Sequence, residues 1–362
     1  MQIPLIDVKA QYAPLQAELE ARFREILGSG QFIRGPHYYA FQEEAAAFLG
    51  VSKTIGVANG TDALVIVLDA MGIGPGDEVI CPAFTFYATA ESIARRGATP
   101  VFAEIDPVTL NLEPEDVAAK ITDRTRAIMP VHLFGRPAAM DELAKLGVPL
   151  IEDAAQAFGA PGVATHGIAS TYSFFPTKNL FCLGDGGLVA TSDEELADRV
   201  KVLAFHGSRD KTDFDFVGYN SRLDELQAGM LRIFLEQLDG WNRGRREAAA
   251  RYAELGLGEL VELPQDEPGH IYHLFVCRSP ERDRIRAALS DAKIGSATYY
   301  TIPLHLQPAL RFLGYEAGSL PETERAAEVN FSVPLWPGMP VDAQERVVDV
   351  VRSAVGVGAP AA

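Results

Sequence analysis

Short apolar segments alternate with amphipathic segments along the first two thirds of the chain. Segments with the composition of β-strands lie at 54–58, 78–82, 99–105, 126–131, 149–153, 170–175 and 187–191. Between them, apolar residues recur at helical spacing at 61–71, 84–96, 138–146 and 193–205. Such alternation is typical of βαβ units. The pattern therefore predicts an α/β fold, with a mostly parallel seven-stranded sheet flanked by helices.

The pattern changes at both ends of this region. Further helical patterns lie at 10–28, 38–49, 222–238, 280–292 and 341–354, and one clear strand follows residue 270, at 271–277. The segments beyond about residue 245 predict a smaller α+β domain. We place the large domain, with the N-terminal helices, at residues 1–240, and the small C-terminal domain at residues 241–362.

Composition narrows the class of protein. The 362 residues are 48% hydrophobic, which is enough for a sizeable core, and carry a net charge of -17. This charge repels phosphate backbones and anionic membranes, so we expect neither nucleic acid nor a membrane as a partner. The start, "MQIPLIDVKAQYAPL", lacks the regions of a signal peptide. Three cysteines, far apart, form no metal-ligand spacing and no disulfide framework. We expect a cytoplasmic protein with reduced thiols and no metal.

One lysine interrupts an apolar, aromatic segment. Residues 173–187 read "SFFPTKNLFCLGDGG", with Lys178 at their centre. An ammonium group is costly to bury without a partner. The following glycines lack the order of a nucleotide P-loop or of a dinucleotide fingerprint. A lone lysine is ordinarily a solvated surface residue, but the apolar neighbours of Lys178 favour a functional role.

Two strand-to-helix junctions offer ligand contacts. The segment "ANGTDAL" (58–64) has an Asn-Gly turn and Thr61 as a possible helix cap, and the free amides of a helix start bind phosphate well. In "CPAFTFYAT" (81–89), Phe84 lies at the carboxyl edge of the sheet, where open α/β sheets bind ligands. Taken alone, an ordinary capped helix and ordinary core packing are the commoner interpretations.

A third junction carries carboxylates. In "PLIEDAAQAFGA" (149–160), an apolar strand leads straight into Glu152 and Asp153, with Gln156 one turn later. A carboxylate at the end of a buried strand needs a cation or several donors. The N–H of a protonated pyridine ring would supply one, and a helix-capping carboxylate is the alternative. Ser173, five residues before Lys178, offers a hydroxyl for a phosphate.

Together these segments supply a phosphate cradle, a stacking aromatic, an acidic partner for a ring nitrogen, and a lysine. These are the protein groups that pyridoxal phosphate needs. The carboxylate would keep the ring protonated, and the lysine would form a Schiff base and then move a proton.

In combination, the motifs resemble those of the DegT/DnrJ/StrS-type sugar aminotransferases, pyridoxal-phosphate-dependent enzymes of fold type I. The resemblance extends from "IPLIDVKAQY" to about residue 350. It rests on "ANGTDAL", "GDEVICPAFTFYATA", "IEDAAQAFGA", "SFFPTKNLFCLGDGG", "YNSRLDELQA" and "YYTIPLHLQPAL".

The resemblance implies cofactor roles for individual residues. Lys178 would bond to the cofactor, and Asp153 would pair with the ring nitrogen. Gln156 would lie near the ring 3-hydroxyl, and Phe84 would stack on the ring. Phosphate binding would fall to Gly60, Thr61 and Ser173.

The resemblance also implies a homodimer whose active sites are shared between two chains. Asn220 would reach the phosphate bound by the partner subunit, and Arg222 would contact substrate across the interface. Tyr299 and Tyr300 would contact substrate as well. Relatives that act on uronic acid sugars often have His-Tyr-Pro here, whereas this chain has Tyr299, Tyr300 and Thr301. This departure weakens the case for a uronic acid substrate.

The function implied is amino transfer to a nucleotide-linked keto-hexose, with L-glutamate as donor and 2-oxoglutarate as its product. Amination at C3 is favoured over C4, and the pathway implied is synthesis of a polysaccharide or a glycosylated metabolite. A related dehydratase branch has histidine in place of Lys178. Two alternatives remain: an aminotransferase of a cyclitol or aminoshikimate-type ketone, and a non-catalytic regulatory protein on the same fold.

Overall fold

The computed structural model describes residues 2–356. Its large part is built on seven strands in the spatial order β1-β7-β6-β5-β4-β2-β3. The strands are β1 (Lys53–Val57), β2 (Glu78–Pro82), β3 (Thr99–Ala103), β4 (Thr125–Ile128), β5 (Ile151–Asp153), β6 (Ala169–Ser173) and β7 (Gly187–Thr191). Only β7 runs antiparallel to its neighbours within this sheet. The predicted mostly parallel sheet is confirmed.

A seam divides this sheet between β4 and β5. Continuous pairing gives one group of four strands, β1-β7-β6-β5, and one of three, β3-β2-β4. Two isolated parallel bridges, Ile128–Leu150 and Val131–Asp153, join the groups. The second bridge lies at Asp153, so the seam passes through the residue that the sequence singled out.

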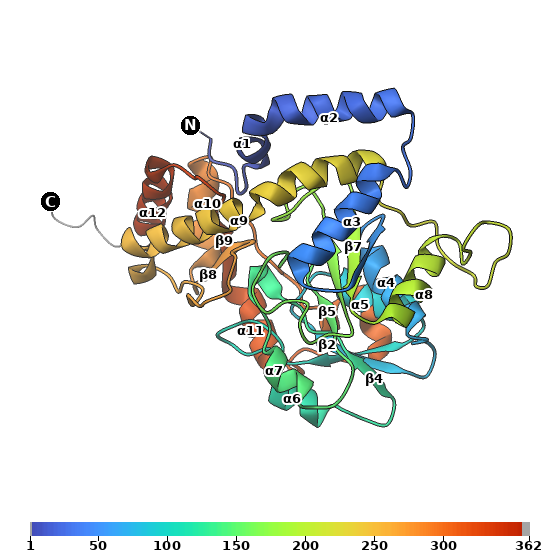
Figure 1. Ribbon diagram of the computed structural model, residues 1–362. Coiled ribbons are helices and arrows are strands. Elements are labelled where there is room, and N and C mark those ends of the chain that lie inside the picture. The colour runs from blue at the N-terminus through green and yellow to red at the C-terminus, as the bar shows by residue number, and fades with distance from the viewer. Residues whose placement is uncertain (1, 357–362) are drawn as a thin grey trace.

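Helices cover both faces of the sheet (Figure 1). They are α1 (Val8–Tyr12), α2 (Gln16–Ser29), α3 (Pro36–Leu49), α4 (Gly60–Ala70), α5 (Ala88–Arg95), α6 (Pro114–Ala119), α7 (Met140–Ala144), α8 (Glu194–Ala204), α9 (Glu225–Glu254), α10 (Arg282–Asp291), α11 (Pro321–Val329) and α12 (Val341–Val355). Buried residues of α4, α5 and α8 pack on one side of the sheet, and those of α3 and α9 on the other. None of the helices among residues 2–356 is both long and apolar enough to cross a bilayer.

The small part has its own core around β8 (Phe275–Arg278) and β9 (Asn330–Val333), which pair antiparallel. The helix α9 links the two parts, as Figure 1 shows, because it continues from 225 to 254 rather than ending near 238. Gly240 and Gly244 lower helix propensity in its middle, which explains the short prediction. The predicted boundary at 240 falls inside this helix. Ile3 also pairs with Ile294 of the small part, so the division at 240 stays a prediction.

One buried carboxylate ties α3 to the start of α9. Glu225 is 1% exposed and accepts hydrogen bonds from the backbone N–H groups of His37 (2.7 Å) and Tyr38 (2.9 Å). These N–H groups belong to the first turn of α3, which has no capping side chain of its own at Gly35. Glu225 therefore satisfies donors that would otherwise lie buried without acceptors, and its charge suits the positive end of the helix.

We predict that Glu225→Gln destabilises the protein by about 1–3 kcal/mol, because an amide offers one acceptor oxygen where two donors are buried. Denaturant unfolding at fixed protein concentration measures the change. Glu236→Gln is the control, because Glu236 lies exposed on the same helix, and it should stay within about 0.5 kcal/mol of the parent protein. Equal stability of the two variants would contradict the capping role.

Candidate active site

Asp153 ends β5 at the carboxyl edge of the sheet and is 5% exposed. The Thr89 hydroxyl donates to its Oδ2 (2.8 Å), and the Ala155 N–H donates to its Oδ1 (3.2 Å). Burial raises the pKa of Asp153, and these donors and the charge of Lys178 offset the rise only in part. A buried carboxylate held in this way is suited to a further donor, such as the N–H of a protonated ring.

Lys178 follows β6 in a turn closed by its N–H to the Phe175 carbonyl oxygen (2.8 Å). Burial lowers the pKa of Lys178 from 10.5 to about 8, while the negative charge of Asp153 raises it. The residue as a whole is half-buried. An amine with this pKa has a sizeable neutral fraction near pH 7–8, which is what a nucleophilic lysine requires.

The predicted phosphate site falls at the start of α4. Its N-cap is Asn59, whose side chain accepts from the Asp62 N–H (2.8 Å); the expectation that Thr61 caps this helix was wrong. Gly60 and Thr61 instead contribute N–H groups to the open helix end. A Cβ on Gly60 would lie 2.7 Å from the Cβ of Ser173, so glycine is required for this close approach. The structure thus brings Gly60 into contact with Ser173, and phosphate binding by Gly60, Thr61 and Ser173 stays a prediction.

The two phenylalanines of "CPAFTFYAT" have different surroundings. Phe84 is fully buried and packs edge-on against Phe134 (ring centroids 6.3 Å apart) and Tyr300 (6.0 Å). Phe86 is 58% exposed and lies 6.4 Å from the Tyr300 ring. As the rings stand, Phe86 offers an open face to a ligand and Phe84 does not.

Gln156 connects the sheet edge to the C-terminal part. Its Oε1 accepts from the Phe134 N–H (2.6 Å), and its Nε2 donates to the Tyr300 hydroxyl (3.1 Å). Tyr299, beside it, donates its backbone N–H to Asn330 Oδ1 (2.8 Å). The structure therefore places Tyr300 at Gln156 and Tyr299 next to it. Burial raises the pKa of the Tyr300 hydroxyl, which favours its neutral form.

Asn220 and Arg222 lie in the segment between α8 and α9. Ser221, between them, donates its hydroxyl to Asp62 Oδ2 (2.7 Å), so this segment runs beside the start of α4. Asn220 is exposed and is bridged to Phe205, whose ring lies 5.9 Å from the Arg222 guanidinium. Among the described residues, no contact links either side chain to Lys178.

Sequence reasoning did not identify three residues that contact the predicted site residues. Thr89 looked like an ordinary residue of a predicted helix, and Asn59 like part of a turn. His273 lies within the predicted strand at 271–277, yet its Nδ1 lies 3.2 Å from Oδ1 of Asn179, the neighbour of Lys178. Burial lowers the pKa of His273 well below its ordinary value, and the charge of Lys178 adds to the effect. His273 is therefore a neutral imidazole in contact with the residue that follows Lys178.

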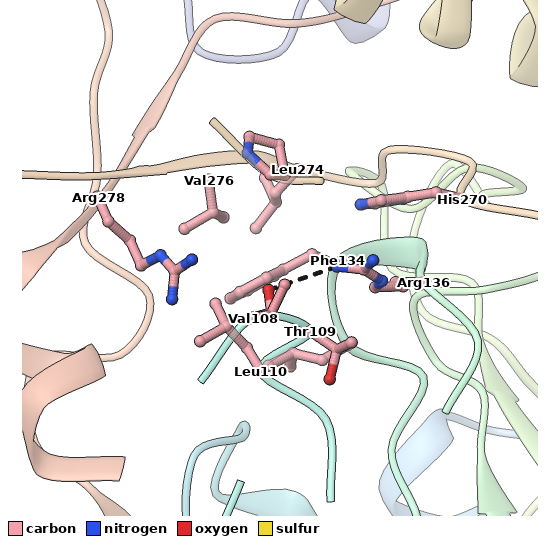
Figure 2. Close-up of a pocket in the computed structure, with 11 residues that line it drawn as sticks. Val108, Thr109, Leu110, Phe134, Arg136, His270, Leu274, Val276 and Arg278 are labelled. Carbon is pink, nitrogen blue, oxygen red and sulfur yellow. Dashed lines mark hydrogen bonds between the residues drawn. The ribbon is translucent and has the colours of Figure 1, made fainter. Parts of the chain in front are cut away.

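A small pocket is lined by Phe134 and by residues of both the large and the small part (Figure 2). Two cations line it, but both are held: Arg136 by Glu267 and by the Val108 carbonyl oxygen, and Arg278 by Glu262. This pocket therefore adds no free charge to the site. The residues described also contain no group of three side chains suited to hold a metal ion.

The residues present fit pyridoxal phosphate. The amine of Lys178, whose pKa is lowered, lies near the buried carboxylate of Asp153, which can accept a further hydrogen bond. At the start of α4, Gly60 has no Cβ and lies against Ser173 at the end of β6. When bound, the cofactor would be held by Lys178, Asp153 and the Gly60–Thr61 amides, and it would supply an electron sink.

Comparison with known proteins gives the same result. Residues 14–352 match the DegT/DnrJ/EryC1/StrS aminotransferase family. A Geobacillus stearothermophilus protein named pleiotropic regulatory protein is 45% identical, covering 97% of this chain and 98% of the relative. An Acidithiobacillus ferrooxidans protein named UDP-N-acetyl-3-dehydro-alpha-D-glucosamine 3-aminotransferase is 42% identical, covering 97% of each chain.

Among solved structures, DesV of Streptomyces venezuelae, crystallised with a ketimine intermediate, superposes with a TM-score of 0.94 at 42% identity. The match covers 98% of this chain and 99% of that one. Several relatives are nucleotide-sugar 3-aminotransferases by name. With a family match across nearly its whole length and the lysine and carboxylate in place, the chain is a pyridoxal-phosphate-dependent member of the DegT/DnrJ/EryC1/StrS aminotransferase family.

Proposed function

We propose that this aminotransferase transfers an amino group from L-glutamate to C3 of a nucleotide-linked keto-hexose. The observation that carries the reaction type is the pairing of Lys178, with a pKa of about 8, with the buried carboxylate of Asp153. The preference for C3 over C4 is supported by the names of the 3-aminotransferase relatives. Synthesis of a polysaccharide or a glycosylated metabolite is the proposed pathway.

The geometry supports the following proposed roles. Lys178 Nζ takes up and returns the proton that moves during amino transfer, which its lowered pKa permits near neutral pH. Asp153 accepts the ring N–H, while Thr89 fixes the orientation of the carboxylate. The open N–H groups of Gly60 and Thr61, with the Ser173 hydroxyl, hold the phosphate.

We assign the stacking role to Phe86 rather than to Phe84, because only the Phe86 ring is exposed. Phe84 then supports the site from behind, edge-on to Tyr300. Gln156, fixed between Phe134 and Tyr300, would lie near the ring hydroxyl of the bound cofactor, and Tyr299 and Tyr300 would contact the sugar.

A homodimer is part of the proposal. The segment from Ser208 to Val217 extends away from the large part (Figure 1). It exposes Phe214 (59%), Phe216 (44%) and Val217 (97%), and an apolar patch of this kind marks a protein interface. Asn220 and Arg222 follow directly. A second copy that covers this segment would bring both polar side chains to its own site, which explains why neither contacts Lys178 within one chain.

A non-catalytic regulatory function is the second candidate, because the Geobacillus stearothermophilus relative carries a regulatory name. A protein that had left catalysis would have no need to retain a lysine of lowered pKa beside a buried carboxylate. Both are retained here, so we favour catalysis.

The experiment that tests the function is a panel of UDP-, dTDP- and GDP-linked 3-keto and 4-keto sugars with glutamate, read by mass detection of the amino sugar. We expect turnover of a 3-keto sugar and loss of at least ~10³-fold in Lys178→Ala, because the proton carrier is removed. Keto-cyclitols in the same panel test the other substrate class. Full activity of Lys178→Ala would overturn the mechanism, and turnover of a 4-keto sugar or a cyclitol alone would overturn the substrate.

The lowered pKa of Lys178 makes a prediction about pH. In the cofactor-free protein, reductive methylation of Lys178 should rise with pH around a midpoint of about 8, because only the neutral amine reacts. Asp153→Asn removes a charge that favours the ammonium form, so the midpoint should fall. Mass spectrometry of the Lys178 peptide measures both curves. Asp141→Asn, on the exposed surface, is the control. A midpoint that rises in Asp153→Asn would refute this electrostatic coupling.

Gly60→Ala tests the cradle. The added Cβ would meet the Ser173 Cβ at 2.7 Å, so α4 must move away from β6 and carry its N–H groups out of place. We expect affinity for pyridoxal phosphate to fall at least ~10-fold, measured by titration of the cofactor-free protein, since one lost charge-assisted hydrogen bond accounts for that much. Gly240→Ala, where a Cβ meets nothing within 4 Å, should bind normally. Unchanged affinity in Gly60→Ala would place the phosphate elsewhere.

A further inference from the structure

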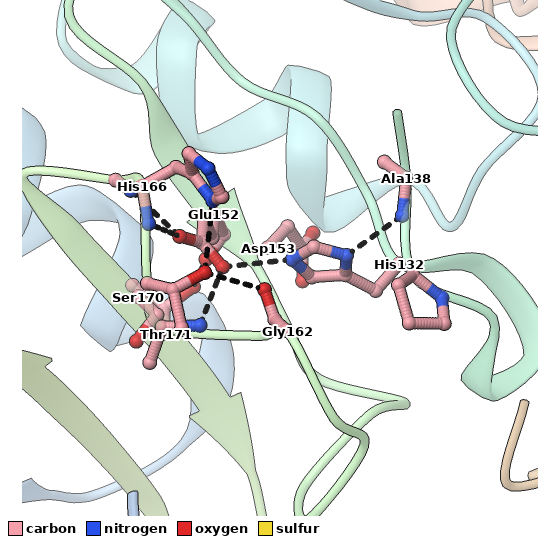
Figure 3. Close-up of polar contacts among 12 residues, drawn as sticks. His132, Ala138, Glu152, Asp153, Gly162, His166, Ser170 and Thr171 are labelled. Carbon is pink, nitrogen blue, oxygen red and sulfur yellow. Dashed lines mark hydrogen bonds and ion pairs between the residues drawn. The ribbon is translucent and has the colours of Figure 1, made fainter. Parts of the chain in front are cut away.

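Glu152 is a fully buried carboxylate that the reaction does not use directly. Successive strand residues point to opposite faces, so Glu152 faces away from its neighbour Asp153. Its side chain is 0% exposed, as is that of His132, and the His132 Nε2 lies 2.9 Å from Glu152 Oε2 (Figure 3). A buried carboxylate is costly unless donors surround it, so its presence here requires a reason.

Hydrogen bonds define the proton positions of the pair. The Ala138 N–H donates to His132 Nδ1 (3.0 Å), so Nδ1 is an acceptor and the ring proton is on Nε2. Nε2 therefore donates to Glu152, and the imidazole is neutral. The contact is a hydrogen bond from a neutral histidine to a carboxylate rather than an ion pair.

Backbone groups complete the surroundings of Glu152. The N–H groups of Ala164 (2.7 Å), His166 (3.3 Å) and Gly167 (2.7 Å) all donate to it. Burial alone would raise the pKa of Glu152, but the hydrogen bonds from His132 and from this loop outweigh burial and lower it. Every partner of the carboxylate is a donor, so it is held as an anion.

The pair lies at the seam of the sheet. The backbone N–H of His132 donates to the Asp153 carbonyl oxygen (3.0 Å), and the Asp153 N–H donates to the Pro130 carbonyl oxygen (2.9 Å). The three-stranded group also contacts the side chain of Asp153. Thr89, in the helix α5 that follows β2, donates a hydrogen bond to the Asp153 carboxylate. The position of Asp153 relative to Thr89 therefore depends on how the two groups of strands are joined.

The same turn places a second site residue. Phe134, two residues after His132, donates its N–H to Gln156 Oε1 (2.6 Å) and packs against Tyr300. A shift of the turn would thus disturb Asp153, Gln156 and Tyr300 together.

We propose that Glu152 and His132 are positioning residues, whose hydrogen bond joins the two halves of the sheet and holds Asp153 and Gln156 in the geometry that amino transfer needs. This inference rests on the proposed function for its kinetic test but not for its spectroscopic one.

The test uses the holoenzyme and two readouts: kcat and KM for the best sugar, and the pH midpoint of the visible absorbance of the bound cofactor. In Glu152→Gln, the amide N–H₂ group must face other donors, so the hydrogen bonds that hold this side chain, including the one from His132, are disrupted. We expect kcat to fall ~10- to 100-fold with KM unchanged, as for a displacement of about 1 Å at a catalytic group. The absorbance midpoint should move upward, because a displaced Asp153 holds the ring proton less firmly, which leaves the nitrogen of Lys178 more basic.

Two variants at 132 form a matched pair. His132→Gln keeps an N–H donor at the position of Nε2, whereas His132→Asn keeps only an acceptor for the Ala138 N–H. Both remove the ring, so a general packing defect affects both alike. We expect His132→Gln to retain most of kcat and the parent midpoint, and His132→Asn to behave like Glu152→Gln.

Glu78→Gln is the control for loss of a buried strand carboxylate. Glu78 is 8% exposed and held by Thr122 and Arg124 at the start of β2, the end of the sheet remote from Asp153. It should change neither kcat nor the midpoint.

The proposal is overturned if folded Glu152→Gln keeps the parent kcat and midpoint, or if His132→Gln and His132→Asn lose both equally. If Glu152→Gln does not fold, the matched pair decides. If the parent enzyme aminates none of the sugars, the proposed function fails by itself, and the absorbance midpoint still tests the positioning role.

Discussion

The site depends on two adjacent carboxylates that one short strand buries on opposite sides. Asp153 accepts a hydrogen bond from Thr89 and lies near Lys178, and Glu152, on the opposite face, is surrounded by donors. Burying a single carboxylate is costly, and burying two in sequence is stable only if each has its own donors. The fold meets this requirement with segments from three places: a helix after β2, the turn after β4, and the loop before β6.

The pKa of Lys178 depends on the same arrangement. Burial lowers the pKa of its amine, and the charge of Asp153 prevents a larger fall, so the pKa settles at about 8. The neutral His273 next to Asn179 adds no competing charge in its deprotonated form. A lysine buried without Asp153 would be less basic still, and one in solvent would be almost wholly protonated at pH 7. The pKa of Lys178 is thus the balance of two opposing effects, burial and the charge of Asp153.

Much of this was predictable from the sequence, and the misses have physical causes. The apolar alternation predicted the sheet and its helices, because burial on both faces leaves a strong period in the sequence. The helix α9 was cut short because Gly240 and Gly244 weaken a local signal that tertiary packing overrides. Thr61 was taken for a cap because threonine caps well, but Asn59 reaches the Asp62 N–H instead.

Contacts between distant segments are what the sequence could not predict. Thr89 is 64 residues from Asp153, and His132 is 20 residues from Glu152, so no spacing rule links them. Likewise, only the folded chain shows that Phe84 is enclosed while Phe86 is open. The seam between β4 and β5 is the clearest case. Each strand alone reads as a buried apolar segment, yet their junction carries few backbone pairs and two polar side chains. At this junction the Glu152–His132 hydrogen bond adds to the few backbone pairs, and Asp153 lies beside it.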